Sequence, residues 1–175
     1  GSLPNTFSYY CDEGLGLVEY KTDRFGLRNI DSKWNKLINK SNIFVVGDSF
    51  THGACVNKDL TIPDYVNKET NINTINLASG GNGPYEYMAL MKTILDPILK
   101  ETDTQNWVVM IFYFNDNVRY KNYSNTLLSK AKSIISLNQS GDVSPNHEYK
   151  VTINELINKN FPTTKNQLIK ATKNS

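Results

Sequence analysis

The sequence predicts an α/β fold with a central parallel β-sheet. Short apolar runs alternate with segments of helical period, in the order strand, helix, strand, helix, strand. Because parallel strands cannot be joined by a tight turn, connections of this length favour right-handed crossovers. A chain of 175 residues is long enough for one domain with a substantial core. We therefore predict an irregular lead-in over residues 1–40 and a single α/β domain over residues 41–175.

Three short segments predict the strands of the sheet. The first, Ile43–Val46, stops abruptly at Gly47-Asp48-Ser49, and the second, Asn73–Leu77, is equally short. The third, Trp107–Phe114, is continuous and rich in β-formers, so we expect a strand buried on both faces. Upstream of these runs, Asp23–Asn29 predicts a turn followed by a short extended piece.

Helices are predicted between these strands. One covers Leu60–Lys68, and a longer one with an apolar stripe covers Tyr85–Leu99, where Pro97 should bend or end it. Later in the chain the signal weakens. Tyr123–Leu137 predicts a further helix and Gln139–Asn146 a loop, with no other buried strand.

Composition excludes several classes of function. The formal net charge is +2 and the basic residues are scattered, so nothing indicates a nucleic-acid or anionic-membrane partner. No apolar run approaches the roughly 20 residues of a transmembrane helix. Cys11 and Cys55 allow one bridge but no disulfide framework, and Tyr9-Tyr10 are interpreted as packing or rim residues. Gly1-Ser2 resembles an expression scar, so the sequence does not indicate where the protein is located. A secreted or cell-envelope protein is one interpretation left open.

Three polar loops directly follow the three predicted strands. They are Gly47-Asp48-Ser49, the glycine-rich stretch from Asn76 to Gly83, and Tyr113–Asn117. In a parallel sheet all three loops leave the same edge, which is where open α/β folds carry their chemistry. We therefore expect these loops to lie together.

The residues on these loops match the needs of acyl transfer. Ser49 supplies a nucleophilic hydroxyl, and the backbone N–H groups of Ser49 and Gly81 can point at a developing oxyanion. The side-chain amide of Asn115 can add a further donor. Each such donor is typically worth about a hundredfold to a thousandfold in rate. Chemistry of this kind needs no cofactor or metal, and the histidines and cysteines have no metal-ligand spacing.

On these motifs the chain resembles the SGNH (GDSL-type) hydrolase family. Gly47-Asp48-Ser49 matches the serine block, Gly81 the glycine block and Asn115-Asp116 the asparagine block. Asp23–Asn29 and Ser79–Pro84 also look like segments of bacterial members. The resemblance covers roughly residues 20–120. It implies a three-layer flavodoxin-like fold and hydrolysis of esters, often carbohydrate acetyl or lipid acyl esters, by a serine esterase or deacetylase; some relatives transfer acyl groups instead.

The chain departs from the family pattern in two places. Tyr113 stands where the asparagine block commonly has glycine, which many bacterial relatives tolerate. No Asp-x-x-His motif is present to supply the base. His52 and His147 are weaker candidates, because His52 follows Ser49 by one helical turn and His147 lies in a polar loop. We expect the last strand and the base segment to lie beyond Ser175.

Two other functions stay open. One is a catalytically inactive SGNH-like module that binds glycans, or a domain associated with O-acyl transfer. The other is a flavodoxin-like protein that binds phosphate or a nucleotide at the same sheet edge, although no phosphate-loop pattern is present. The expected partner is a small-molecule or glycan ester, and the sequence does not fix the acyl group, the alcohol or the oligomeric state.

Overall fold

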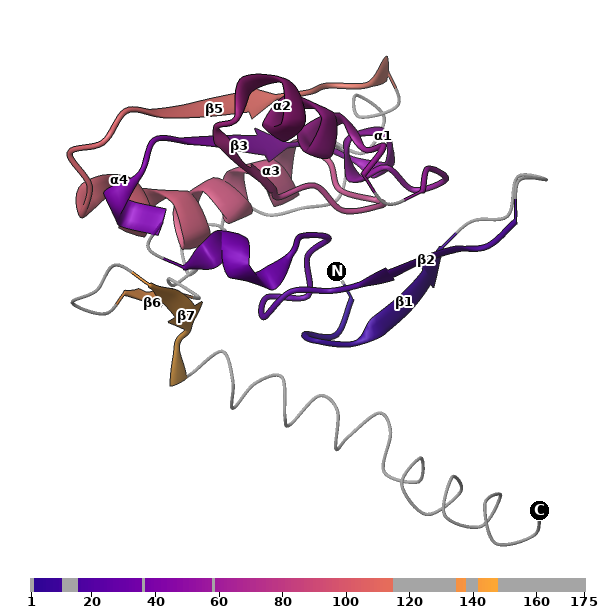
Figure 1. Cartoon of the computed structure of the whole chain (residues 1–175), viewed down its shortest axis with the longest axis horizontal. Coiled ribbons are helices and arrows are strands. Elements are labelled where there is room, and N and C mark those ends of the chain that lie inside the picture. The colour runs from indigo at the N-terminus through magenta and orange to yellow at the C-terminus, as the bar shows by residue number, and fades with distance from the viewer. Residues whose placement is uncertain are drawn as a thin grey trace, which may run out of the picture.

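A computed structural model of the protein describes residues 2–10, 16–35, 37–57, 59–114, 135–137 and 142–147. At its centre is a three-stranded parallel sheet in the order β4-β3-β5 (Figure 1). The strands are β3 (Asn42–Val46), β4 (Asn73–Asn76) and β5 (Asn106–Met110). The predicted α/β class with a parallel sheet is therefore confirmed.

Helices connect the strands of this sheet. After β3 come α1 (Ser49–His52) and α2 (Ile62–Thr70), and after β4 come α3 (Pro84–Leu90), the π-helical turn η3 (Met91–Leu95) and α4 (Asp96–Lys100). β4 lies on one side of β3 and β5 on the other, so the connection from β4 to β5 passes β3. Right-handed crossovers then place α2 and α3 on opposite faces of the sheet, and in Figure 1 they lie on different sides of β3.

The long helix after β4 continues past Pro97. Its first turn follows Pro84, and the Glu86 carboxylate accepts a hydrogen bond from Gly83 N (2.9 Å). The π-helical turn precedes α4, which contains Pro97 and runs to Lys100. Proline lacks an N–H group, and the wider turn before it accommodates that loss without ending the helix.

The prediction that β5 is buried on both faces is wrong. Its apolar residues Trp107, Val108 and Val109 are between 39% and 43% exposed, and the strand ends at Met110, before Phe114. Within the described residues β5 pairs with β3 alone, so it is an edge strand of this sheet. An apolar run of this kind does not by itself distinguish a central strand from an edge strand.

Two antiparallel hairpins were not predicted. The first joins β1 (Phe7–Tyr10) to β2 (Val18–Lys21) within the predicted irregular lead-in. The second joins β6 (Ile135–Leu137) to β7 (Val143–Pro145), where the sequence predicted the end of a helix and a loop. Those two predictions are wrong for these residues, and the rest of the predicted helix, 123–134, lies outside the described residues. β2 alternates buried and exposed residues over Val18–Lys21, a signal that the prediction missed, whereas β6 and β7 have only three residues each and are too short for such a signal.

The lead-in shares one apolar core with the sheet. It contributes the short helices η1 (Asp31–Trp34) and η2 (Leu37–Asn39). Side chains from the lead-in, the central strands, the α3–α4 segment and β7 form one buried cluster, which includes Phe25, Trp34, Leu37, Phe44, Ile75, Tyr87, Ile94 and Val143. The first residues of the chain are thus part of the structure that supports the sheet.

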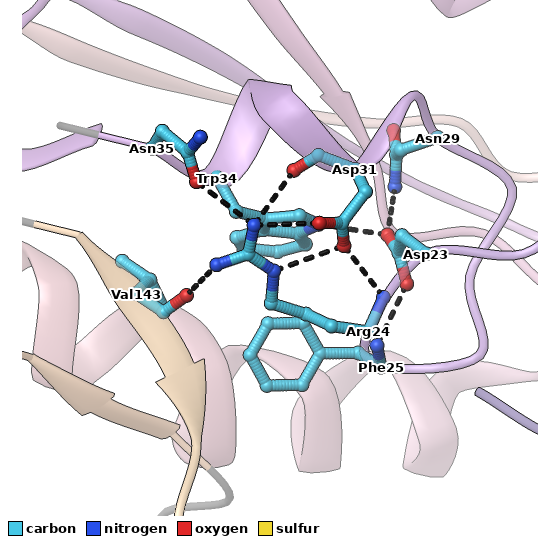
Figure 2. A network of polar contacts seen from close by, with 8 residues as sticks. All are labelled: Asp23, Arg24, Phe25, Asn29, Asp31, Trp34, Asn35 and Val143. Carbon is cyan, nitrogen blue, oxygen red and sulfur yellow. Dashed lines mark hydrogen bonds and ion pairs between the residues drawn. The ribbon is translucent and has the colours of Figure 1, made fainter. Parts of the chain in front are cut away.

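A polar network joins this lead-in to β7 (Figure 2). The Arg24 guanidinium donates to both carboxylate oxygens of Asp31 (2.9 and 2.6 Å) and to the backbone oxygen of Val143 (2.6 Å). Bidentate pairing of this kind fixes the orientation of the guanidinium plane. The β6–β7 hairpin is therefore held against the lead-in by a directional contact as well as by the burial of Val143.

Candidate active site

The three predicted loops start from one edge of the sheet. Their first backbone groups are hydrogen-bonded to the carboxyl end of β3 and the turn after it: Leu77 N to Val45 O (2.8 Å), Ser79 N to Gly47 O (3.4 Å) and Ile111 N to Val46 O (2.9 Å). These bonds continue the parallel pairing of β3 with its two neighbours. The loops after β3, β4 and β5 are thus adjacent where they leave the sheet.

Ser49 is the first residue of α1. The Asp48 side chain caps this helix by accepting a hydrogen bond from Phe50 N (2.9 Å), so Asp48 shapes the turn that presents Ser49. Ser49 is half-buried, and neither its hydroxyl nor its N–H group is hydrogen-bonded to a described residue. The helix ends at Gly53, which has a φ of 76°, and Cys55 just beyond it is disulfide-bonded. The chain's other cysteine, Cys11, lies outside the described residues.

Gly81 occupies a tight turn in the loop after β4. Asn82 N donates to Ser79 O (3.2 Å), and Gly81 inside this turn has a φ of 85°. Only glycine adopts that left-handed conformation without strain, so the turn itself requires glycine here. The Gly81 N–H group donates to no described residue and the residue is exposed. It is available to a ligand at the rim of the sheet.

Asn115 lies outside the described residues, so its position relative to Ser49 is not given. The third loop is described as far as Phe114. Its Tyr113 ring stacks on the Phe50 ring of α1, with centroids 3.9 Å apart. The loop after β5 therefore reaches the residue next to Ser49, which the sequence did not predict.

A tyrosine of the N-terminal hairpin borders the glycine-rich loop. The Tyr10 hydroxyl occupies the space that a β-carbon on Gly80 would need, with the ring carbon Cζ only 3.1 Å from that position. The Tyr10 ring also meets the His52 ring edge-on, with centroids 5.4 Å apart. The sequence placed Tyr10 among packing or rim residues, and it fills both roles. Tyr10 and Gly80 are far apart in the sequence, so no local sequence pattern indicates that they lie close together.

The two candidate bases lie elsewhere. His52 is buried, its Nε2 is hydrogen-bonded to the Tyr20 hydroxyl (3.1 Å), and its Nδ1 has no partner among the described residues. Burial, and then the charge of Arg28, lowers the pKa of His52 to about 4. His147 is exposed and follows β7, which lies far from α1 in Figure 1. Neither histidine is hydrogen-bonded to Ser49.

Acid is expected to destabilise the fold through His52. Its folded-state pKa of about 4 lies below the value of 6.5 for a free histidine, so only the unfolded chain gains this proton between those pH values. The free energy of unfolding should therefore fall by about 3 kcal/mol as the pH falls through this window. Urea unfolding at pH 7 and pH 4 measures the loss. It should be much smaller in His52→Gln but intact in His147→Gln, which alters an exposed residue; equal losses in the two variants would contradict this assignment.

A side chain of the lead-in holds the start of the glycine-rich loop. Asn29 accepts from Asn76 N (2.8 Å) and donates to Asn76 O (2.9 Å), as a neighbouring strand would. The Asn29 amide is itself held by the buried Asp23 carboxylate (2.8 Å; Figure 2). The Asn76 side chain in turn accepts from Ala78 N (3.0 Å). The predicted turn at Asp23–Asn29 thus positions the loop that carries Gly81, a role that the sequence did not reveal.

Neither a metal-binding cluster nor a membrane-spanning helix is found in the described ranges. No group of three or more histidine, cysteine or acidic side chains there is arranged to hold a metal ion. None of the helices in the same ranges is long and apolar enough to cross a membrane. Comparisons of the chain with models of protein families, with curated proteins and with solved structures gave no match.

Proposed function

We propose that the protein is a serine hydrolase of the SGNH type that cleaves ester bonds, as an esterase or a carbohydrate O-deacetylase. The observation that carries the proposal is the hydrogen bond between Ser79 N and Gly47 O, which joins the loop of Gly81 to the turn of Ser49. Two N–H groups that lack a partner among the described residues, those of Ser49 and Gly81, are therefore carried by adjoining loops, and the Ser49 hydroxyl also lacks such a partner. A rim of this kind favours a reaction in which negative charge develops on oxygen. The α/β sheet is compatible with the flavodoxin-like arrangement that the resemblance implies.

In the proposed reaction the Ser49 oxygen attacks the ester carbonyl. The carbonyl oxygen becomes an oxyanion that accepts hydrogen bonds from Ser49 N, Gly81 N and the Asn115 amide. The alcohol then leaves with a proton, and water releases the acid from the acyl-serine. His52 is engaged by Tyr20 and His147 is remote, so the proposal assigns the nucleophile and the donors and gives the base to neither histidine.

A fluorophosphonate probe and p-nitrophenyl acetate test the proposal. We expect the probe to label Ser49 covalently and the ester to be hydrolysed, with both signals lost in Ser49→Ala. Ser79→Ala is the matched control, because Ser79 is a half-buried serine on the neighbouring loop and its backbone N–H group is retained. Absence of labelling at Ser49 in a folded protein that includes the expected base segment beyond Ser175 would favour the alternative, a non-catalytic glycan-binding module. That alternative is kept because no described base is hydrogen-bonded to Ser49.

A further inference from the structure

A cavity of about 600 Å³ lies between the N-terminal hairpin and the chain that leads into α2. Its walls come from β1 and β2, from residues 28–31 and from residues 59–64. Neither Ser49 nor Gly81 is among its lining residues, so it is separate from the candidate active site. Its volume falls within the range of about 300 to 1,000 Å³ that is common for small-molecule sites.

One part of the wall is a buried cation stacked on an aromatic ring. Arg28 is only 6% exposed, and its guanidinium carbon lies 4.6 Å from the centre of the Tyr20 ring. The guanidinium donates to the backbone oxygens of Gly53 and Val56, the latter at 2.7 Å. These contacts hold the side chain in one orientation. The wall is therefore rigid at this point, as a preorganised binding site requires.

Several polar side chains in the wall have unused hydrogen-bonding capacity. The Lys21 ammonium, the Asn5 amide and the Asp59 carboxylate make no hydrogen bond to a described residue. Among the described residues, Glu19 accepts only a long bond from the Tyr9 hydroxyl (3.4 Å). Together these groups offer both donors and acceptors to a ligand.

The charges of the wall cancel. Two of its carboxylates are neutralised by cations outside the wall, Asp31 by Arg24 (2.6 Å) and Asp64 by Lys33 (3.4 Å). The others, Glu19 and Asp59, are balanced by Lys21 and Arg28. A phosphate would meet carboxylates and a polyamine would meet cations, so the wall favours neither. Ligand hydroxyl groups, which both donate and accept, suit such a mixture.

Apolar side chains complete the wall. Phe7 is 65% exposed and Ile30 is also exposed, so both present carbon surface at the cavity. A sugar ring has a C–H face that packs on an aromatic ring and hydroxyls that reach polar groups around it. We propose that this cavity binds a neutral saccharide, with Phe7 against the ring face and Lys21, Asn5, Glu19 and Asp59 at the hydroxyls.

The proposal does not depend on the chemistry of Ser49. If the protein also acts on a carbohydrate ester, the cavity would hold sugar units of the substrate other than the one that reacts. The test therefore uses Ser49→Ala protein, in which turnover cannot change the ligand. Calorimetric titration with the tetrasaccharides of N-acetylglucosamine, xylose, mannose and glucose covers the common neutral units.

We expect at least one tetrasaccharide to bind with a Kd below about 1 mM. Phe7→Ala and Asp59→Asn should each weaken that binding by about tenfold or more. Both residues are exposed, so neither variant should disturb folding. Tyr65→Ala is the matched control, because Tyr65 is a 60% exposed aromatic that does not line the cavity; its affinity should be unchanged.

Three results would overturn the proposal: no binding of any tetrasaccharide at about 10 mM, equal losses in Phe7→Ala and Tyr65→Ala, or inorganic phosphate that competes for the site. Binding that appears in wild-type protein but not in Ser49→Ala would place the sugar at the active-site rim and would overturn it as well. Probe labelling of Ser49 is a separate measurement, so either proposal can fail without the other.

Discussion

Asp23→Ala is expected to lower the free energy of unfolding by about 3 to 5 kcal/mol. The Asp23 carboxylate is fully buried and accepts four hydrogen bonds, from Phe25 N (2.8 Å), Leu27 N (2.9 Å), Asn29 Nδ2 (2.8 Å) and Trp34 Nε1 (2.7 Å). Burial still raises the pKa of this carboxyl, although these bonds oppose the shift. Alanine would remove the acceptor of all four hydrogen bonds, and of the two side-chain donors Asn29 also donates to Asn76 O, in a domain whose whole stability is of the order of 5 to 15 kcal/mol.

Asp31→Ala is the control for this prediction. Asp31 also accepts several bonds, but its side chain is partly exposed and water can replace the Arg24 guanidinium. Its removal should cost about 1 kcal/mol or less. Urea midpoints of both variants against the wild type give the comparison, and similar losses would show that Asp23 does not organise the lead-in. Because Asp23 holds Asn29, which holds Asn76, the Asp23 variant should also lose order in the loop of Gly81.

The central strands could be predicted because their sequence signal is local. Ile43–Val46 is an apolar run that ends at a polar turn, and Asn73–Leu77 is a short segment that ends at a glycine-rich loop. They correspond to β3 and β4 within a residue or so. The crossovers follow from the alternation of strands and helices. The local signal does not give the order of the strands in the sheet. The position of β5 at the edge, and hence its exposure, was therefore not predicted.

The hairpins and the lead-in network depend on contacts between distant parts of the chain. Phe7–Tyr10 forms a strand by pairing with Val18–Lys21. Val143 is buried because it packs in the core, and its backbone oxygen accepts a hydrogen bond from Arg24. Tertiary contacts of this kind override weak local preferences. β2 does alternate regularly between buried and exposed residues, and that four-residue signal was missed.

The candidate site, too, was predicted only in part. The adjacency of the loops after β3, β4 and β5 was predicted from parallel topology, and the hydrogen bonds at the sheet edge confirm that adjacency. The contributions of Tyr10 and Asn29 to that edge were missed, since both come from the lead-in. The roles of Ser49, Gly81 and Asn115 stay predictions.

Gly47→Ala is expected to destabilise the protein by about 3 kcal/mol and to displace Ser49. A β-carbon at this position would lie 2.6 Å from Thr51 Cβ, 3.1 Å from Ile111 O and closer still to Thr51 Oγ1. A rotamer change could move only the hydroxyl of Thr51, because Cβ is fixed by the backbone. Thr51 is fully buried, so the chain at Gly47 must move instead. That movement would also weaken the bond from Ser79 N to Gly47 O.

A double-mutant cycle separates this clash from a general effect of alanine. Thr51→Gly removes the two closest atoms, so Gly47→Ala should cost much less in that background, with a coupling energy of about 1 to 2 kcal/mol. Gly16→Ala is the matched control, because Gly16 has a φ of 89° but no atom of a described residue within 4 Å of the new carbon, and it should cost only about 1 kcal/mol. Urea unfolding gives the stabilities and probe labelling reports the position of Ser49. If Gly47→Ala were as mild as Gly16→Ala and labelled at the wild-type rate, the close packing beneath Ser49 would not be what positions it.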